Sequence, residues 1–429
     1  MYKTKGLEYL KKEFCDDSDR PSPMVFRHVK RLIFIMSTIG SWPHNISGRP
    51  RLHNFLSTYS FILIIVAVMF SGLAGGYLKQ HWDEMTFFDM GHIILTICLN
   101  GIYMTRLMQA RAKKVSEAIR DCFLEFHLYY YKDRSAYWTK IFSEIHIISG
   151  IFTIYILILM MVGMSLFTLK PLYTNYSKGM FSSNPPPNGT FEHSVYFYFP
   201  TDVFYTTLKG HWILFAINLP NNYNVTCGVF GFDLLLILAV LQIYGHIKIM
   251  KHNLLSIPLP KKESDIMFSA EENRQVAQLL KDIIIHHNLI IKFVDKFSDA
   301  FQEYLFLFYF FLQIISCVLL MEVSTLNPEA LAMYGPLTLG MFQQLMLLSI
   351  MFEILNSKSE ELEQVVYAIP WEFMDGRNRK SVLFMLYKVQ TPISLKAGGM
   401  VPVGVKTMSS ILRTSLSYYM VLMALAREQ

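Results

Sequence analysis

Four hydroxyl side chains near the end of the sequence recur at steps of three and four residues, so they would share one face of a helix. The same face continues with the branched aliphatic side chains of Val421 and Leu425. Hydroxyls can line a water-filled ion path, and a ring of aliphatic side chains can close such a path by dewetting. Serine and threonine also hold transmembrane helices together, so a helix–helix contact is the alternative interpretation. The four residues are Thr407, Ser410, Thr414 and Ser417.

Other polar residues within apolar stretches give weaker signals. A carboxylate inside a bilayer is costly, but for Asp233 we favour a structural hydrogen bond within a helix bundle over an ion site. Adjacent histidines point to different faces of a helix, so we interpret His286 and His287 as packing and surface residues. The sequence has no HExxH, GxSxG or phosphate-loop motif, and its five cysteines show no paired spacing. We therefore expect no enzyme, no metal site and no cofactor.

The composition indicates a membrane protein with several spans. Of the 429 residues, 52% are hydrophobic and only 17% are charged, and the mean hydropathy is +0.31. A soluble domain of this length would be less apolar. The first twenty residues are polar, so we expect no cleavable signal peptide. Lysine and arginine exceed aspartate and glutamate by 39 to 33, a surplus that does not indicate a nucleic acid partner.

Seven apolar stretches predict an all-α membrane protein with seven transmembrane helices. We expect a cytosolic arm at 1–54, four helices within 55–249 with an irregular loop at 170–209, and a cytosolic stalk at 250–301. Helices five and six occupy 302–357, a cytosolic anchor segment covers 358–402, and the seventh helix covers 403–429. The basic segment 106–120 is expected to continue the second helix, and the third is expected to end at Lys170-Pro171.

Basic residues set the expected orientation. Lysine and arginine are concentrated in the arm and in the segments that follow helices two, four and six. The positive-inside rule places those segments in the cytosol, so the N-terminus would be cytosolic and the C-terminus extracellular. The loop at 170–209 would then be extracellular, and its sequons at Asn175 and Asn188 become candidate glycosylation sites.

Three motifs within roughly the last seventy residues resemble the insect odorant receptor family. They keep the spacing of that family's segment after the sixth helix, of its linker into the seventh helix and of its terminal signature. The motifs are SEELEQVVYAIPW at 359–371, QTPISLKAGGMVPV at 390–403 and RTSLSYYMVL at 413–422.

The resemblance implies a ligand-gated cation channel in the plasma membrane of sensory neurons, sited on the dendrite. An odorant-specific subunit of this family forms a heterotetramer with a shared olfactory co-receptor, and each subunit gives its seventh helix to the pore. This sequence lacks the co-receptor's long insertion before the fifth helix. Val421 and Leu425 fall at the family's gate positions, with Thr414 and Ser417 lining the path. Ala424 stands where the co-receptor has a polar residue.

The resemblance also implies a small volatile ligand, an odorant or a pheromone, bound among helices two, three, four and six. Apolar and aromatic walls with a few hydroxyls suit a ligand held by burial and shape. Aromatic residues at these spacings are also common in bundle packing, which is the alternative for each of them. Chosen by depth and face, the candidates are Met90, Ile94, Phe152, Tyr155, Leu159, Tyr223, Thr226, Phe230, Tyr334, Thr338 and Phe342.

Three other classes of membrane protein fit less well. A G-protein-coupled receptor has its N-terminus outside, and a transporter would show internal repeats and broken helices. The related gustatory receptors end their seventh helix in Thr-Tyr, aliphatics and Gln-Phe. This sequence instead has Ser417-Tyr418 followed by LARE, which favours the odorant branch.

Overall fold

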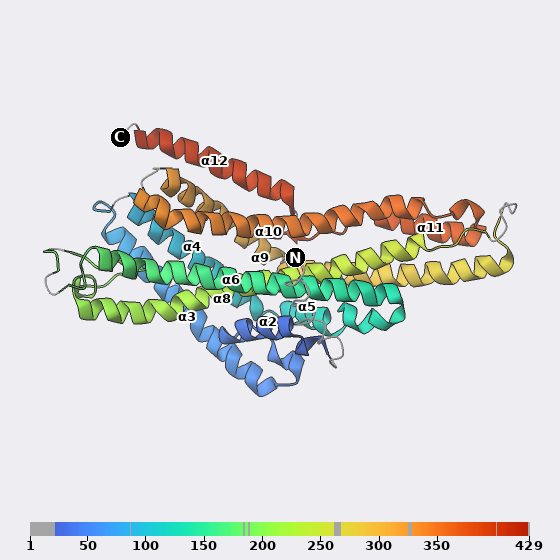
Figure 1. Ribbon diagram of the computed structural model, residues 1–429, viewed down its shortest axis with the longest axis horizontal. Helices are drawn as coiled ribbons and strands as arrows, with labels where there is room; N and C mark the ends of the chain where they lie inside the picture. Colours follow the sequence, from blue (N-terminus) through green and yellow to red (C-terminus); the bar gives the residue numbers. More distant parts are fainter. Residues whose placement is uncertain are drawn as a thin grey trace, which may run out of the picture.

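The computed structural model describes residues 22–427 apart from 86, 183, 184, 188, 261–266, 325–327 and 400. Its side chains are described over the same ranges except at 47, 87, 88, 321–324, 328–334, 336, 337, 401, 402 and 422–427. Long helices run along one common axis and form an elongated bundle (Figure 1). The long helices are α3 (Pro50–Gln80), α4 (Phe87–Ala110), α6 (Ala136–Ser177), α8 (Leu208–Leu255), α9 (Ala270–Ser324), α10 (Pro328–Tyr367) and α12 (Val405–Arg427).

Six of these helices are long and apolar enough to cross a membrane within the part of the chain whose side chains are described. The seventh expected crossing, α12, is described in full only as far as Val421 and lies outside this set. The apolar window of α8 is 89% buried, whereas that of α3 is 17% buried. A helix that is apolar on all sides belongs in a core, so α8 is the central helix of the bundle.

The other long helices surround α8 in a defined order. α6 and α10 pack along α8, while α4 and α12 pack along α9. α3 covers the outer side of α4, and it exposes Phe61, Ile65 and Met69. α6 likewise exposes Ile158 and Met161 in its apolar half. Such large exposed apolar surfaces suit contact with lipid.

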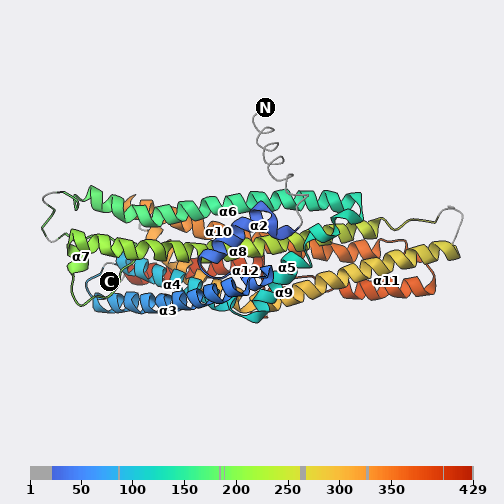
Figure 2. The same ribbon diagram turned by 90° about the horizontal axis from the view of Figure 1, so that it is seen from below.

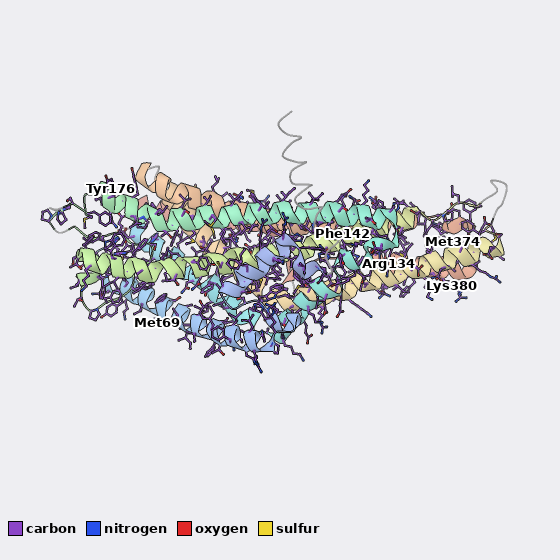
Figure 3. The ribbon with its side chains drawn as sticks, turned by 60° about the horizontal axis from the view of Figure 1, so that its bottom comes forward. Met69, Arg134, Phe142, Tyr176, Met374 and Lys380 are labelled. Carbon is purple, nitrogen blue, oxygen red and sulfur yellow. The ribbon has the colours of Figure 1, made fainter. Side chains whose placement is uncertain are left out.

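Figure 3 shows which residues lie at each end of the elongated molecule. Met69 and Tyr176 lie toward one end, whereas Met374 and Lys380 lie at the other. That second end contains the continuous extension of α9, the end of α10 and the helix α11 (Gly376–Val389). The first part of α9, from Ala270, lies within the segment 250–301 for which the sequence predicts a stalk.

Two predicted boundaries are wrong. The second helix does not continue through 106–120, because α4 ends at Ala110 and a separate helix, α5 (Lys113–Leu124), begins after an extended residue at Ala112. This break lets the buried face of α5, which includes Val115 and Ile119, pack against α9. The third helix does not end at Lys170-Pro171 but continues through Pro171 to Ser177.

Short elements connect the long helices. The N-terminal part contains η1 (Pro23–Val25), α2 (Arg27–Thr38) and η2 (His44–Ser47), and α2 lies against α8 and α6 (Figure 2). η3 (Leu128–Arg134) follows α5, α7 (Val203–Thr206) precedes α8, and η4 (Trp371–Phe373) precedes α11. A two-stranded hairpin of β1 (Lys396–Ala397) and β2 (Val401–Pro402) leads into α12. Gly398 and Gly399 between the strands have positive φ angles of 58° and 73°.

Candidate ligand cavity and pore helix

A cavity of about 400 Å³ lies between α3, α4, α6, α8 and α10. This volume suits a small organic molecule. The walls are mainly aliphatic and aromatic, so a ligand would be held chiefly by removal of apolar surface from water. Apolar lining residues are Phe70, Ala74, Ile97, Leu99, Leu159, Val162, Leu166, Phe167, Val195, Val225, Val229, Phe230, Leu339 and Met341.

Several side-chain amides contribute to the polar part of the cavity wall, among them Asn100 and Gln344. Asn100 on α4 donates through Nδ2 to the carbonyl oxygen of Ala67 at 2.8 Å and to the hydroxyl of Ser71 at 2.7 Å. Gln344 on α10 donates to the carboxylate of Asp233. These bonds tie α4 to α3 and α10 to α8, so the polar groups also fix the helices that form the walls.

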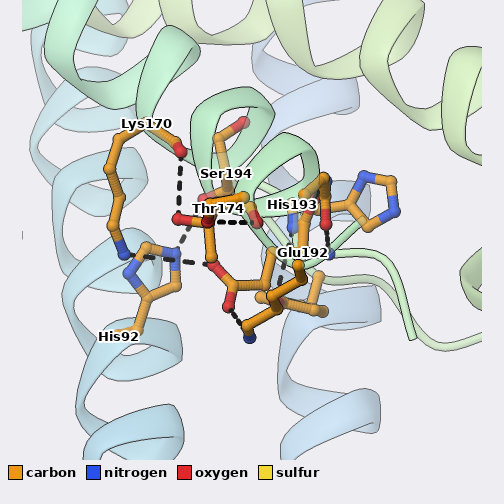
Figure 4. Close-up of polar contacts among 10 residues, drawn as sticks. His92, Lys170, Thr174, Glu192, His193 and Ser194 are labelled. Carbon is orange, nitrogen blue, oxygen red and sulfur yellow. Dashed lines mark hydrogen bonds and ion pairs between the residues drawn. The ribbon is translucent and has the colours of Figure 1, made fainter. Parts of the chain in front are cut away.

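The connection between α6 and α8 closes one end of the cavity. Figure 4 shows His92 and Lys170 beside the loop residues Glu192 and Ser194. The Nε2 atom of His92 lies 2.9 Å from the carbonyl oxygen of Ser194, and Lys170 lies 4.0 Å from the Glu192 carboxylate. Val195, which follows directly, forms part of the wall. The loop between α6 and α8 therefore contributes to the wall of the cavity.

Gln344 also contacts a buried ion pair, formed by Arg106 and Asp233. Arg106 of α4 lies 2.8 Å from Asp233 of α8, and neither side chain is exposed by more than 1%. Arg106 also donates to the carbonyl oxygen of Gly228 at 2.8 Å and to the hydroxyl of Tyr304 on α9. The pair therefore joins three helices, and Gln344 adds a fourth.

The expectation of a structural hydrogen bond at Asp233 agrees with this geometry. Sequence reasoning missed Arg106, which it assigned to a cytosolic basic segment, although an arginine close to a span is a natural partner for an intramembrane carboxylate. Gln242, which follows Asp233 by nine residues on α8, accepts a hydrogen bond from the backbone nitrogen of Leu128 at 3.0 Å.

The structure brings three of the predicted ligand-binding residues to the cavity wall: Leu159, Thr226 and Phe230. Tyr334 has a side chain outside the described residues. The other candidates do not line the cavity: on α6 the lining begins only at Leu159, one turn beyond Tyr155, and on the other helices the candidates alternate with lining residues and so lie on a different side. They are Met90, Ile94, Phe152, Tyr155, Tyr223, Thr338 and Phe342. Sequence reasoning also missed the contribution of α3, whose Phe70, Ser71 and Ala74 complete the wall.

The pore face predicted for the terminal helix points away from the bundle. α12 packs on α9 and α10 through its other side, where Ile411 and Ser415 are buried. The amide of Gln313 on α9 lies 2.7 Å from the Ser415 hydroxyl. Ser417 and Val421 are exposed, Val421 by 54%. Thr414 is partly buried and donates to the carbonyl oxygen of Ser410, while the side chains of Ala424 and Leu425 lie outside the described residues.

Two further sequence interpretations change in the structure. His286 and His287 are both buried, so neither is the surface residue that we expected. His286 lies 2.9 Å from His246, and no cluster of three potential metal ligands occurs among the described residues. Asn175 is fully buried and bonds Glu192 through both ends of its amide, which disfavours a glycan there. Asn188 lies outside the described residues.

Comparisons with known sequences and solved structures all find odorant or olfactory receptors. The sequence profile of the family described as 7tm Odorant receptor matches residues 90–416. Odorant receptor 67a of Drosophila melanogaster is 23% identical over 198 residues, which is 46% of this chain and 47% of that protein. The chain thus aligns with about half the length of this curated relative.

Solved structures of the olfactory receptor OR5 from Machilis hrabei, alone and in complex with eugenol, have a similar fold. Each superimposes with a TM-score of 0.73 at 14% identity, over 92% of this chain and 97% of theirs. The prediction of an all-α membrane fold is therefore confirmed.

Proposed function

The chain belongs to the insect odorant receptor family, and we propose that it is an odorant receptor subunit that binds a small volatile organic ligand in the cavity among α3, α4, α6, α8 and α10. Receptors of this family are not enzymes, in agreement with the sequence. The observation that carries the proposal is a cavity of about 400 Å³ with mainly apolar walls. The olfactory receptor OR5, which shares the fold, has been solved with the odorant eugenol.

Ligand binding in this proposal opens a cation channel in the plasma membrane of a sensory neuron dendrite. The exposed face of α12, with Ser417 and Val421, supports a path formed between subunits, because nothing in this chain's described part covers it. The chain and the olfactory co-receptor together form the heterotetramer. Hydroxyls line the conducting part of the path, and Val421 with Leu425 closes it.

Whole-cell current provides the test. Cells express the chain with or without an insect olfactory co-receptor, G-protein signalling is blocked, and a panel of volatiles is applied. We expect a fast cation current only when both proteins are present. A response that disappears when G proteins are blocked would contradict the channel proposal, and so would silence to every volatile from a chain that reaches the cell surface.

A cavity-filling variant tests the location of the ligand. Gly163 of α6 lines the cavity, and a Cβ atom built there meets only Phe230, at 4.0 Å. Gly163→Leu should therefore fill the space and abolish the response while surface expression persists. The matched control is Gly72→Leu, since Gly72 on α3 has open space around it and does not line the cavity. Equal effects of the two variants would argue against this cavity.

A further inference from the structure

Two amides that line the cavity have carbonyl oxygens that accept no hydrogen bond from another described residue. Asn100 commits Nδ2 to Ala67 and Ser71, and its Oδ1 atom is buried with no hydrogen bond in the described structure. Gln344 commits Nε2 to Asp233, and no hydrogen bond from a described residue reaches its Oε1 atom. Both side chains are more than nine-tenths buried, with 6% and 4% exposure.

The partners fix the orientation of these two amides. Nδ2 of Asn100 faces a backbone carbonyl, and Nε2 of Gln344 faces a carboxylate, and both partners can only accept a hydrogen bond. Turning either amide over would place oxygen against oxygen. Each carbonyl oxygen is therefore held as an acceptor, and a buried acceptor left unpaired carries a free-energy cost.

Two threonine hydroxyls on the same wall are committed as donors. Thr96 donates to the carbonyl oxygen of Ile93 at 2.8 Å, and Thr226 donates to the carbonyl oxygen of Asn222 at 2.7 Å. Lys170, the one charged residue among the described lining residues, lies beside Glu192. These two threonines thus hold their protons within their own helices, and Asn100 and Gln344 add two acceptor oxygens to the wall.

We propose that the cavity selects ligands that carry a hydrogen-bond donor, namely volatile alcohols or phenols, whose hydroxyl is accepted by the carbonyl oxygens of Asn100 and Gln344. This inference rests on the proposed function and specifies its ligand class. An ether or ester of the same size fills the apolar space equally well. It offers these oxygens no proton, and it displaces any water that could have supplied one.

Isomeric pairs of volatiles test the selection, because the two members have the same atoms and differ in their donor. Suitable pairs are octanol with heptyl methyl ether, phenylethanol with benzyl methyl ether, and ethylphenol with methylanisole. We expect the alcohol or phenol to act at about threefold to tenfold lower concentration, as one net hydrogen bond would give. Equal potency, or a preference for the ethers, would overturn the inference and leave the receptor function standing. Silence to both members of every pair and to the whole volatile panel would instead count against the receptor function.

Variants then assign the preference to residues. Asn100→Leu and Gln344→Met keep the side-chain size and remove the acceptor, so the potency ratio within each pair should fall toward one in either variant or in the double variant. The potency ratio between the two isomers of a pair is insensitive to reduced expression of the receptor, because lower expression affects the responses to both isomers alike. Thr226→Val is the matched control on the same wall, since its hydroxyl is used by its own helix, and its ratio should equal that of the wild type. A ratio that survives in the double variant would refute the role of these two amides.

Discussion

The ion pair between Arg106 and Asp233 permits a quantitative test of the packing of four helices. Asp233→Asn keeps an oxygen for hydrogen bonding but leaves the arginine charge buried without a counter-charge. Arg106→Gln leaves the carboxylate with Gln344 and Tyr304 as its neighbours. Both side chains are almost completely buried and their charged atoms lie 2.8 Å apart, so water cannot replace the missing partner.

The expected magnitude follows from this burial. Breaking a buried pair by removing one partner costs about 3–5 kcal/mol, because the remaining charge stays desolvated. An unfolding entropy of about 2.1 cal/mol/K per residue gives about 0.9 kcal/mol/K for a chain of this length, so each single variant should lower Tm by about 3–6 °C. The double variant removes both charges, and its loss should be smaller than the two single losses together by about 2 kcal/mol.

The Tm of the wild type, the two single variants and the double variant is measured on the detergent-solubilised protein, with size-exclusion chromatography used to detect unfolding. Glu303→Gln is the control, since Glu303 is 71% exposed and its pair with Lys114 spans 3.2 Å at the surface. Exposed pairs contribute about 0–1 kcal/mol, so this variant should unfold near the wild-type temperature. Single variants as stable as the control, or losses that simply add, would refute the argument from burial.

Three further results are expected. Burial, and after it the charges of the neighbouring histidines, lowers the pKa of His127 to about 3. Between about pH 3 and 6.5 the unfolded chain therefore binds more protons at this residue than the folded chain does. Acid thus lowers the free energy of unfolding, by about 2 kcal/mol at pH 5. His127→Asn keeps an acceptor for the backbone and should flatten the fall of Tm from pH 7 to 5; an unchanged slope contradicts this. Gly228→Ala places a Cβ atom 2.4 Å from the Tyr103 ring and should cost about 1–3 kcal/mol, measured by Tm, whereas Gly72→Ala, in open space, should not. Val421→Ser should raise the basal current with the co-receptor, and an unchanged leak would refute a dewetted gate there.

The sequence predicts the helices of this protein well because hydrophobic periodicity and length are local properties. The segment expected to form the stalk is helical from Ala270 onward, and the helix expected at 403–429 is α12. The errors occur where tertiary contacts override local preference. Pro171 remains inside α6, and the last turn of that helix is held by Asn175 and its two hydrogen bonds to the Glu192 backbone.

The cavity was predicted at the level of helices but only partly at the level of residues. Depth along a helix can be read from a sequence, whereas the rotation of each helix against its neighbours cannot. On α10, for example, Leu339 lines the cavity whereas its neighbour Thr338 does not, because successive residues are rotated by about 100° around the helix axis. The partner of Asp233 required knowledge of which helix adjoins α8, and the sequence held no such signal.

The hairpin before α12 holds the first turn of this helix in place, so that the rest of the helix can tilt about that fixed end. Gly398 donates to the carbonyl oxygen of Gln302 on α9 at 2.9 Å, and the first turn of α12 donates from Val405 to Glu353 on α10 at 3.0 Å. One end of α12 is thereby attached to two helices. Val421 stands about 24 Å along the helix from Val405, so a tilt of about 5° displaces it by about 2 Å. The pivot itself hardly moves, whereas the displacement grows along the helix and reaches the exposed side chain of Val421.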